Sequence, residues 1–250
     1  MSPVSHRPDE FTRRIALAIL TVAFLGGTFM FAQDPPKEGK PAPATDAAAA
    51  PAPAELPKPD AEGWISLFNG KDLTGWKGNP AIWRVENGYI SGKVEKQDYN
   101  TFLVTEHSFS DFVLEAKVIL LQGPGFTNSG IQYRSRLIDP AKWIVGGYQA
   151  DMGKDWWGSL YEEKSEVGRG VLVKAPPEAE KSVKAEDWNQ YVITAKGWRL
   201  KQSLNGIDTV DFEDANEKGR RAEGVIALQY HAPGGFEVRA KDIRIKPLGK

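Results

Sequence analysis

The sequence predicts an all-β fold in which two antiparallel sheets pack face to face. From residue 63 onward, short runs of alternating apolar and polar side chains are separated by turns rich in Gly, Asn and Asp. We count about a dozen such runs, and no helical pattern is long enough to cross over between parallel strands. Short antiparallel strands at this spacing are typical of a β-sandwich, and residues 61–250 suffice for one such domain.

The first 60 residues are expected to lie outside that domain. Arg13 and Arg14 precede the apolar residues 15–25, which is the layout of a signal peptide that could be cleaved after Ala32. Residues 15–32 are short of the roughly 20 residues of a spanning helix, which favours the signal peptide. Met30, however, fits the cleavage pattern poorly, so an uncleaved membrane anchor is the alternative. We therefore expect an exported protein, periplasmic or extracellular, that is anchored to the inner membrane if its leader is retained.

A linker is predicted between this leader and the folded domain. It is rich in Pro, Ala, Lys and Glu and nearly lacks large apolar side chains, so it cannot bury a core. The expected organisation is a signal peptide or membrane anchor, a Pro/Ala-rich linker and a β-sandwich domain, at residues 1–32, 33–60 and 61–250.

Composition excludes several classes of function. A net charge of −1 without a basic stripe gives no case for nucleic-acid binding, and the absence of cysteine excludes disulfides and thiolate metal sites. Only His107 and His231 lie in the domain, so a zinc site with several histidines is excluded. We expect no cofactor. Calcium is the alternative, since it takes carboxylates and backbone carbonyls, although no loop of fixed spacing supports it. Its candidate ligands are Asp151, Asp155, Glu162 and Glu163.

The individual strands can be placed from their alternation and from the turns between them. Residues 111–121 form the longest clean alternation, with Phe112, Leu114 and Ala116 on one face. Asn87-Gly88 and Asn205-Gly206 are strong turn signals and predict two hairpins. The excursion over residues 175–187 is rich in Pro, Glu, Lys and Ala and is expected at the surface. The remaining expected strands are residues 65–68, 102–105, 131–136, 147–152, 188–195, 224–231 and 236–245.

Three of these strands carry polar side chains on one face and apolar or small side chains on the other. A turn at Asn128-Ser129-Gly130 is expected before the first of them. If the three strands are neighbours in one sheet, their apolar faces share the core and their polar faces share one cleft. The alternative is a set of ordinary solvated strand faces. The polar residues are Gln132, Arg134 and Arg136, then Gln149 and Asp151, then Gln229 and His231.

An aromatic loop follows the second of these strands. Trp156 and Trp157 are adjacent and are flanked by Asp155 and Gly158, so in an extended segment they cannot both point inward. We interpret this pair as a platform for stacking a sugar ring; packing in the core is the alternative. Tyr161, Glu162 and Glu163 follow directly and are expected as secondary cleft residues.

Several phrases of the sequence occur together in an order that resembles the 3-keto-disaccharide hydrolase family. The resemblance extends over residues 63–248 and implies a concanavalin-like jelly-roll sandwich in an exported bacterial protein that acts on carbohydrate. It also implies an activity, the cleavage of glycosides already oxidised to a ketone at sugar carbon 3. The phrases are ISLFNGKDLTGW at residues 65–76, Asp111-Phe112, Asn128-Ser129-Gly130-Ile131, Gly158-Ser159-Leu160-Tyr161, Trp188-Asn189, Leu204-Asn205-Gly206 and Ala227-Leu228-Gln229-Tyr230-His231.

The chain departs from the family pattern at one position of chemical interest. Where many members carry Tyr-Glu-Val-Gln, this chain carries Tyr148-Gln149-Ala150-Asp151, so that the acid and the amide have exchanged places. Two residues along a strand return to the same face. Either the carboxylate has moved along that face, or its role is lost.

A ketone at C3 acidifies the hydrogen on C2, which makes elimination of the group on C1 the chemistry that this resemblance implies. The reaction needs a base near C2, a donor at the enolate oxygen and an acid at the leaving oxygen. Asp151 or His231 fits the base or the acid, and Arg134 fits the donor because its charge is permanent. The expected substrate-binding residues are Asn128, Gln132, Gln149, Trp156, Trp157, Tyr161, Glu162 and Gln229.

Two other functions are compatible with the same sequence. A non-catalytic, lectin-like carbohydrate-binding module would use the same sandwich and the same aromatic pair, and an adhesion or scaffold domain is a weaker alternative. Catalysis requires titratable side chains that converge in the cleft, whereas a lectin does not. The sequence does not indicate an oligomeric state.

Overall fold

The computed structural model describes residues 52–164 and 167–249, and in this part it consists of two antiparallel sheets and one short helix, α1 (Pro177–Ser182). The leader and most of the linker lie outside the described residues. Every strand pairing is antiparallel, as predicted. The first sheet has the order β13 (Ile207–Glu213), β12 (Arg199–Leu204), β11 (Asn189–Lys196), β6 (Phe112–Leu121), β15 (Glu237–Pro247), β4 (Tyr89–Lys93) and β3 (Trp83–Glu86), with β1 (Ile65–Ser66) on β15. The second has the order β10 (Gly170–Val173), β9 (Leu160–Glu163), β8 (Ile144–Gly153), β7 (Asn128–Asp139), β14 (Gly224–Tyr230), β5 (Thr101–Phe109) and β2 (Trp76–Lys77).

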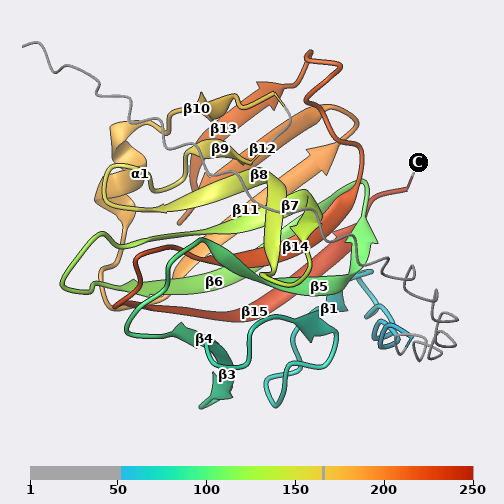
Figure 1. Cartoon of the computed structure of the whole chain (residues 1–250). Coiled ribbons are helices and arrows are strands. Elements are labelled where there is room, and N and C mark those ends of the chain that lie inside the picture. Colours follow the sequence, from blue (N-terminus) through green and yellow to red (C-terminus); the bar gives the residue numbers. More distant parts are fainter. Residues whose placement is uncertain (1–51, 165–166, 250) are drawn as a thin grey trace, which may run out of the picture. The chain divides into compact units, whose positions relative to one another are not determined.

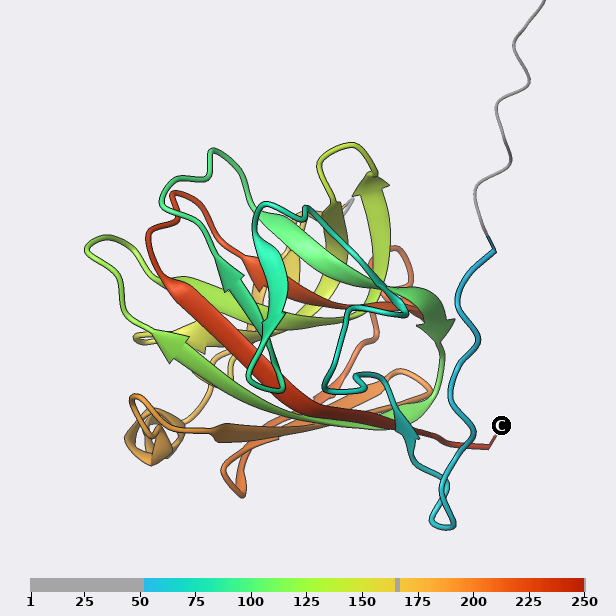
Figure 2. The same cartoon turned by 90° about the horizontal axis from the view of Figure 1, so that it is seen from below.

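The core lies between the two sheets, which Figures 1 and 2 show as stacked layers. The alternate residues of β6 that the sequence assigned to one face are all buried in it, and Ile131, Tyr133 and Leu228 of the second sheet pack into the same core. Burial of these apolar side chains between the sheets is the main stabilising contribution in a β-sandwich. The opposite face of the second sheet is therefore left for the polar residues of β7, β8 and β14.

The predicted hairpins are confirmed, and their turns have the expected backbone. Asn87 and Gly88 join β3 to β4, and Asn205 and Gly206 join β12 to β13, all with positive φ angles. Two consecutive left-handed residues match the twist of the flanking strands, and Asn-Gly adopts this conformation at little cost.

The segment 128–130 is not a turn, contrary to expectation. Asn128, Ser129 and Gly130 are the first residues of β7 and pair with Gly153, Met152 and Asp151 of β8. Ser129 donates a hydrogen bond to the Gln229 carbonyl at 2.7 Å, which ties this strand start to β14. Cross-strand pairing has overridden the local turn preference of these residues.

Bulges bend the β7–β8 pair over the outer face of its own sheet. The register shifts between Tyr133 and Arg136, and again between Leu137 and Asp139. Extra residues of this kind bend a strand and increase its twist. As a result Val145 packs on the outer face of the sheet, in a small apolar cluster separate from the main core that also contains Phe102, Val104 and Ala227.

Residues of the predicted linker contact the domain at their described end. The Ala54 amide donates to Glu106 at 3.2 Å, and the Ala54 carbonyl lies 2.6 Å from His107 Nε2. Within the described part of the chain, no helix has the length and apolar character that a membrane span requires.

Candidate functional site

A cavity of about 370 Å³ opens on the outer face of the second sheet. Strands β7, β8 and β9 contribute to it, together with loop residues that precede β5, β7 and β9 and one that follows β14. Among the described residues, its lining contains no lysine or arginine. The lining residues are Asn100, Phe126, Asn128, Gln149, Asp151, Trp156, Tyr161, Glu163 and His231.

Asp151 is the first of two carboxylates in this cavity, and its side chain is almost wholly buried. Oδ1 accepts hydrogen bonds from Asn128 Nδ2 at 3.0 Å, from the Met152 amide at 3.0 Å and from Gln149 Nε2 at 3.3 Å. No hydrogen bond from the described residues reaches Oδ2. Burial, with a smaller contribution from the nearby charge of Glu163, raises the pKa of Asp151 to about 7 in spite of these donors. A carboxyl group with a pKa near neutrality can both give and accept a proton.

A chain of side chains fixes the orientation of the Gln149 amide. Ser135 Oγ donates to Gln132 Oε1, and Gln132 Nε2 donates to Gln149 Oε1, both at 2.7 Å. The Gln149 oxygen is therefore occupied, and its Nε2 is directed at Asp151. Gln132 is fully buried, so it positions Gln149 from behind and does not itself line the cavity.

Glu163 is the second carboxylate of the cavity. Gln229 Nε2 donates to its Oε2 at 3.1 Å and Asn100 Nδ2 to its Oε1 at 3.5 Å, while Asn100 is itself oriented by the Ala232 amide. Burial raises the pKa of Glu163, although the charges of His231 and Lys164 and the two amide donors oppose this. Gln229 is fully buried, so it holds Glu163 and does not line the cavity.

Aromatic side chains form the rim. Tyr161 comes from β9 and Trp156 from the loop before it. Phe126, on the loop before β7, is 52% exposed. The Phe126 ring lies edge-on to His231, with 5.0 Å between ring centroids. The His231 ring Nδ1 pairs with the Ala232 carbonyl, which leaves Nε2 for a ligand. Aromatic faces beside carboxyl and amide groups are the combination that binds a sugar ring.

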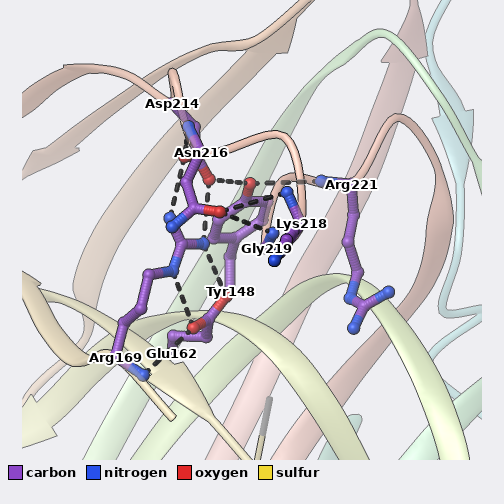
Figure 3. A network of polar contacts seen from close by, with 8 residues as sticks. All are labelled: Tyr148, Glu162, Arg169, Asp214, Asn216, Lys218, Gly219 and Arg221. Atoms are coloured by element: carbon purple, nitrogen blue, oxygen red, sulfur yellow. Dashed lines mark hydrogen bonds and ion pairs between the residues drawn. The ribbon is translucent and has the colours of Figure 1, made fainter. Parts of the chain in front are cut away.

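Two residues predicted for substrate binding lie elsewhere. Trp157 is in the core and stacks on Tyr191, with centroids 6.5 Å apart. Glu162 alternates with the cavity residues of β9 and faces the other side of the strand. Figure 3 shows Arg169 between Glu162 and Asp214, and its guanidinium pairs with these carboxylates at 2.6 and 2.8 Å. Glu162 is therefore part of a buried ion-pair network and not part of the cavity.

Arg134 was predicted to hold an oxyanion, but it does not line the cavity. Its φ of 47° and the bulge beside it end the alternation on which that prediction depended. The guanidinium is fully buried and donates to the carbonyls of Ser110, Gly197 and Arg221 and to Asp111 at 2.7 Å. With all of these partners inside the protein, the geometry gives Arg134 a structural role. Asp151 and His231, the other two predicted catalytic residues, do line the same cavity.

Sequence reasoning missed Asn100 and Phe126. Each lies in a loop without a strand pattern, and only the fold brings them to the cavity. In the described part of the chain, no group of three or more His, Asp or Glu side chains is arranged to hold a metal ion.

The fold and the cavity together define a β-sandwich of the jelly-roll class with a polar, aromatic-rimmed site on one sheet. Residues 63–246 match the model of the 3-keto-alpha-glucoside-1,2-lyase-like domain family, and the chain belongs to this family. A curated relative from Bacteroides thetaiotaomicron, a 3-keto-disaccharide hydrolase, is 38% identical over 237 residues that span 76% of this chain and 80% of the relative.

Solved structures support the fold. A provisionally assigned glycosyl hydrolase from Parabacteroides distasonis has a TM-score of 0.56 and 24% identity, covering 76% of this chain and 95% of its own. The carbohydrate-binding module CBM66 from Bacillus subtilis has a TM-score of 0.51 and 19% identity, covering 68% of this chain and 94% of its own. At these identities the likeness concerns the fold alone.

Proposed function

We propose that this protein is a glycoside-cleaving enzyme that acts on 3-keto sugars at the cavity around Asp151. The observation that carries the proposal is the pair of buried carboxylates, Asp151 and Glu163, in one cavity with an aromatic rim. Family membership and the 3-keto-disaccharide hydrolase relative support a hydrolase that acts on glycosides. The elimination and hydration steps are our inference from the chemistry of the site.

The reaction uses the acidity that a C3 ketone confers on the C2 hydrogen. One carboxylate removes this hydrogen, the C1–oxygen bond breaks, and water then adds to C1. Since the lining contains no lysine or arginine among the described residues, neutral donors such as Asn100 and Tyr161 hold the enolate oxygen. Trp156 and Phe126 contact the apolar face of the sugar.

The buried acids also argue for catalysis over simple binding. Burying a carboxyl group costs stability, because the charged form loses its hydration. A lectin that recognises hydroxyl groups gains little from two such groups in one small cavity, whereas proton transfer requires them.

The test is turnover of a 3-keto disaccharide beside binding of the same unoxidised disaccharide. We expect release of free sugar from the 3-keto substrate by the wild-type protein, and a loss of about 100-fold or more in kcat for Asp151→Asn. Calorimetric binding of the unoxidised sugar with no turnover of the oxidised one would instead support the lectin-like module.

We also propose that the protein is exported, on the basis of the leader at residues 13–32. The measurement is the N-terminal sequence of the protein recovered from the native cell. An N-terminus at Gln33 would identify cleavage, an intact leader in the membrane fraction would identify an anchor, and an intact protein in the cytosol would contradict export.

A further inference from the structure

The structure assigns complementary roles to the two carboxyl groups: Glu163 is the base that removes the C2 proton, and Asp151 is the acid that protonates the leaving glycosidic oxygen. This inference rests on the proposed function and deepens it. Glu163 follows Asp151 by twelve positions in the chain and comes from a different strand, yet both line one cavity.

The hydrogen bonds of Asp151 leave one of its two oxygens free to carry a proton. All of its three donors converge on Oδ1, and none from the described residues reaches Oδ2. A neutral carboxyl group has this asymmetry, since its carbonyl oxygen accepts hydrogen bonds and its hydroxyl oxygen carries a proton to donate. A proton on Oδ2 is thus available to a ligand in the cavity.

The surroundings of Glu163 suit a group that begins ionised and takes up a proton. Each of its oxygens accepts a hydrogen bond from an amide, of Asn100 or of Gln229, which favours the carboxylate. The same Gln229 amide has a buried oxygen, Oε1, that has no hydrogen-bond partner. An unpaired buried acceptor is rare and needs an explanation. If the Gln229 amide group rotates by half a turn, protonated Glu163 can donate its O–H to this oxygen, so that Gln229 stabilises the base both before and after proton transfer.

The charges near the cavity favour the same assignment of base and acid. Two neighbouring carboxyl groups in a buried site do not both ionise readily, because the first charge opposes the second. His231 and Lys164 act on Glu163 and favour its charged form, whereas the charge of Glu163 raises the pKa of Asp151. These charges therefore favour ionisation of Glu163 before that of Asp151.

The reaction balances with these two groups and water. Glu163 takes the C2 proton, and the electron pair of that bond forms the enolate at C3. The enolate collapses to a C1–C2 double bond as the C1–oxygen bond breaks, and the Asp151 proton passes to the leaving oxygen. Water then adds at C1, its proton returns to Asp151, and Glu163 gives its proton back to C2. The net change is hydrolysis, and both groups are regenerated.

The experiment distinguishes the role of the acid from that of the base by comparing substrates with different leaving groups. A 3-keto disaccharide needs protonation of its leaving oxygen, whereas a 4-nitrophenyl 3-keto glucoside does not, because nitrophenolate leaves unprotonated. Exchange of the C2 hydrogen of a methyl 3-keto glucoside in D₂O, followed by NMR, reports the base alone.

We expect Asp151→Asn to lose about 100-fold or more on the disaccharide and to stay within about 10-fold of wild type on the nitrophenyl glucoside and in exchange. Glu163→Gln should lose about 100-fold or more in all three assays. The matched control is Glu162→Gln, the adjacent acid on the opposite face of β9. It should leave the ratio of the two cleavage rates unchanged, even if the protein melts at a lower temperature.

The wild-type enzyme gives a second measurement that does not depend on variants. The rate on the disaccharide should fall as pH rises through about 7, where Asp151 loses its proton, and the rate on the nitrophenyl glucoside should not. The assignment is overturned if Glu163→Gln, and not Asp151→Asn, retains activity on the nitrophenyl glucoside, or if Asp151→Asn loses activity equally on both substrates. It is also overturned if the rates on both substrates fall in the same way as pH rises through about 7. Failure of the wild type on every 3-keto glycoside would instead overturn the proposed function.

Discussion

Trp156 and Trp157 show how adjacent side chains of one type acquire different roles. Trp157 is only 6% exposed and stacks on Tyr191 of β11, whose hydroxyl group donates to the Asp151 carbonyl at 2.6 Å. Trp156 is half-buried at the rim, and the Lys174 ammonium group lies 3.9 Å from its ring centroid. One tryptophan therefore belongs to the core, and the other is available to a ligand.

We predict that alanine substitution separates these two roles. Trp157→Ala should lower the free energy of unfolding by about 3–5 kcal/mol, because it opens a cavity in the core. Trp156→Ala should leave stability within about 1 kcal/mol and raise KM for the 3-keto substrate. Urea unfolding and steady-state kinetics measure both effects. An unchanged KM in Trp156→Ala would contradict its place in the binding site.

Asp151 links the chemistry of the site to the stability of the protein. Its pKa is about 7 in the folded protein and 3.8 ordinarily, so between these values the folded state binds the proton more tightly than the unfolded state. The stabilising contribution of the protonated group is complete below the lower value and is lost as pH rises through the higher one. The difference corresponds to roughly 4 kcal/mol as an upper limit.

We therefore predict that Asp151→Asn stabilises the protein at alkaline pH while reducing its activity. The variant has no charge to desolvate, so its Tm should exceed that of wild type at pH 8.5 and match it at pH 4. Calorimetry at both pH values measures the difference. A variant that melts below wild type at pH 8.5 would contradict the burial argument.

At the scale of the element, the β7–β8 pair shows why a strand of the site contains glycine. Gly130 pairs with Asp151, and a Cβ at this position would lie 2.4 Å from the Gln149 side chain. The glycine thus leaves room for Gln149 to lie across β7 and reach Asp151.

We predict that Gly130→Ala lowers kcat on the 3-keto disaccharide by about 10-fold or more, because it displaces the amide that orients Asp151. The double variant with Gln149→Ala should not add the two separate losses, since the clash is then gone. Kinetics of the four proteins in this cycle measure the coupling. Independent, additive effects would contradict the contact, and Gly249→Ala, with open space around it, is the control.

At the scale of the whole molecule, two arginine side chains, one buried and one half-buried, connect segments of both sheets. Arg134 connects the β5–β6 turn, the β11–β12 turn and the segment before β14 through its bonds to Ser110, Gly197 and Arg221. Arg169 connects β9 to the segment after β13 through Glu162 and Asp214, as Figure 3 shows, and Tyr148 of β8 donates to Asp214. Buried ion pairs of this kind are costly to break, because the partners remain buried.

We predict that Arg134→Met lowers the free energy of unfolding by about 3–5 kcal/mol and leaves kcat of the folded enzyme within about threefold of wild type. The control is Arg199→Met, which breaks an exposed pair with Asp211 and should cost under about 1 kcal/mol. Denaturation and kinetics at a temperature where both variants are folded provide the measurement. Lost activity in a fully stable Arg134→Met would restore its predicted catalytic role.

The sequence by itself determined the fold class, because alternation in β6 and Asn-Gly turns are local signals that each strand and hairpin carries separately. It also determined which face of β8 carries Gln149 and Asp151, since the period of an unbroken strand is two. Only the tertiary structure decided the positions of Arg134, Asn100 and Phe126. A bulge changes the parity of a strand, and loops have no periodicity, so their side chains are located by long-range packing alone.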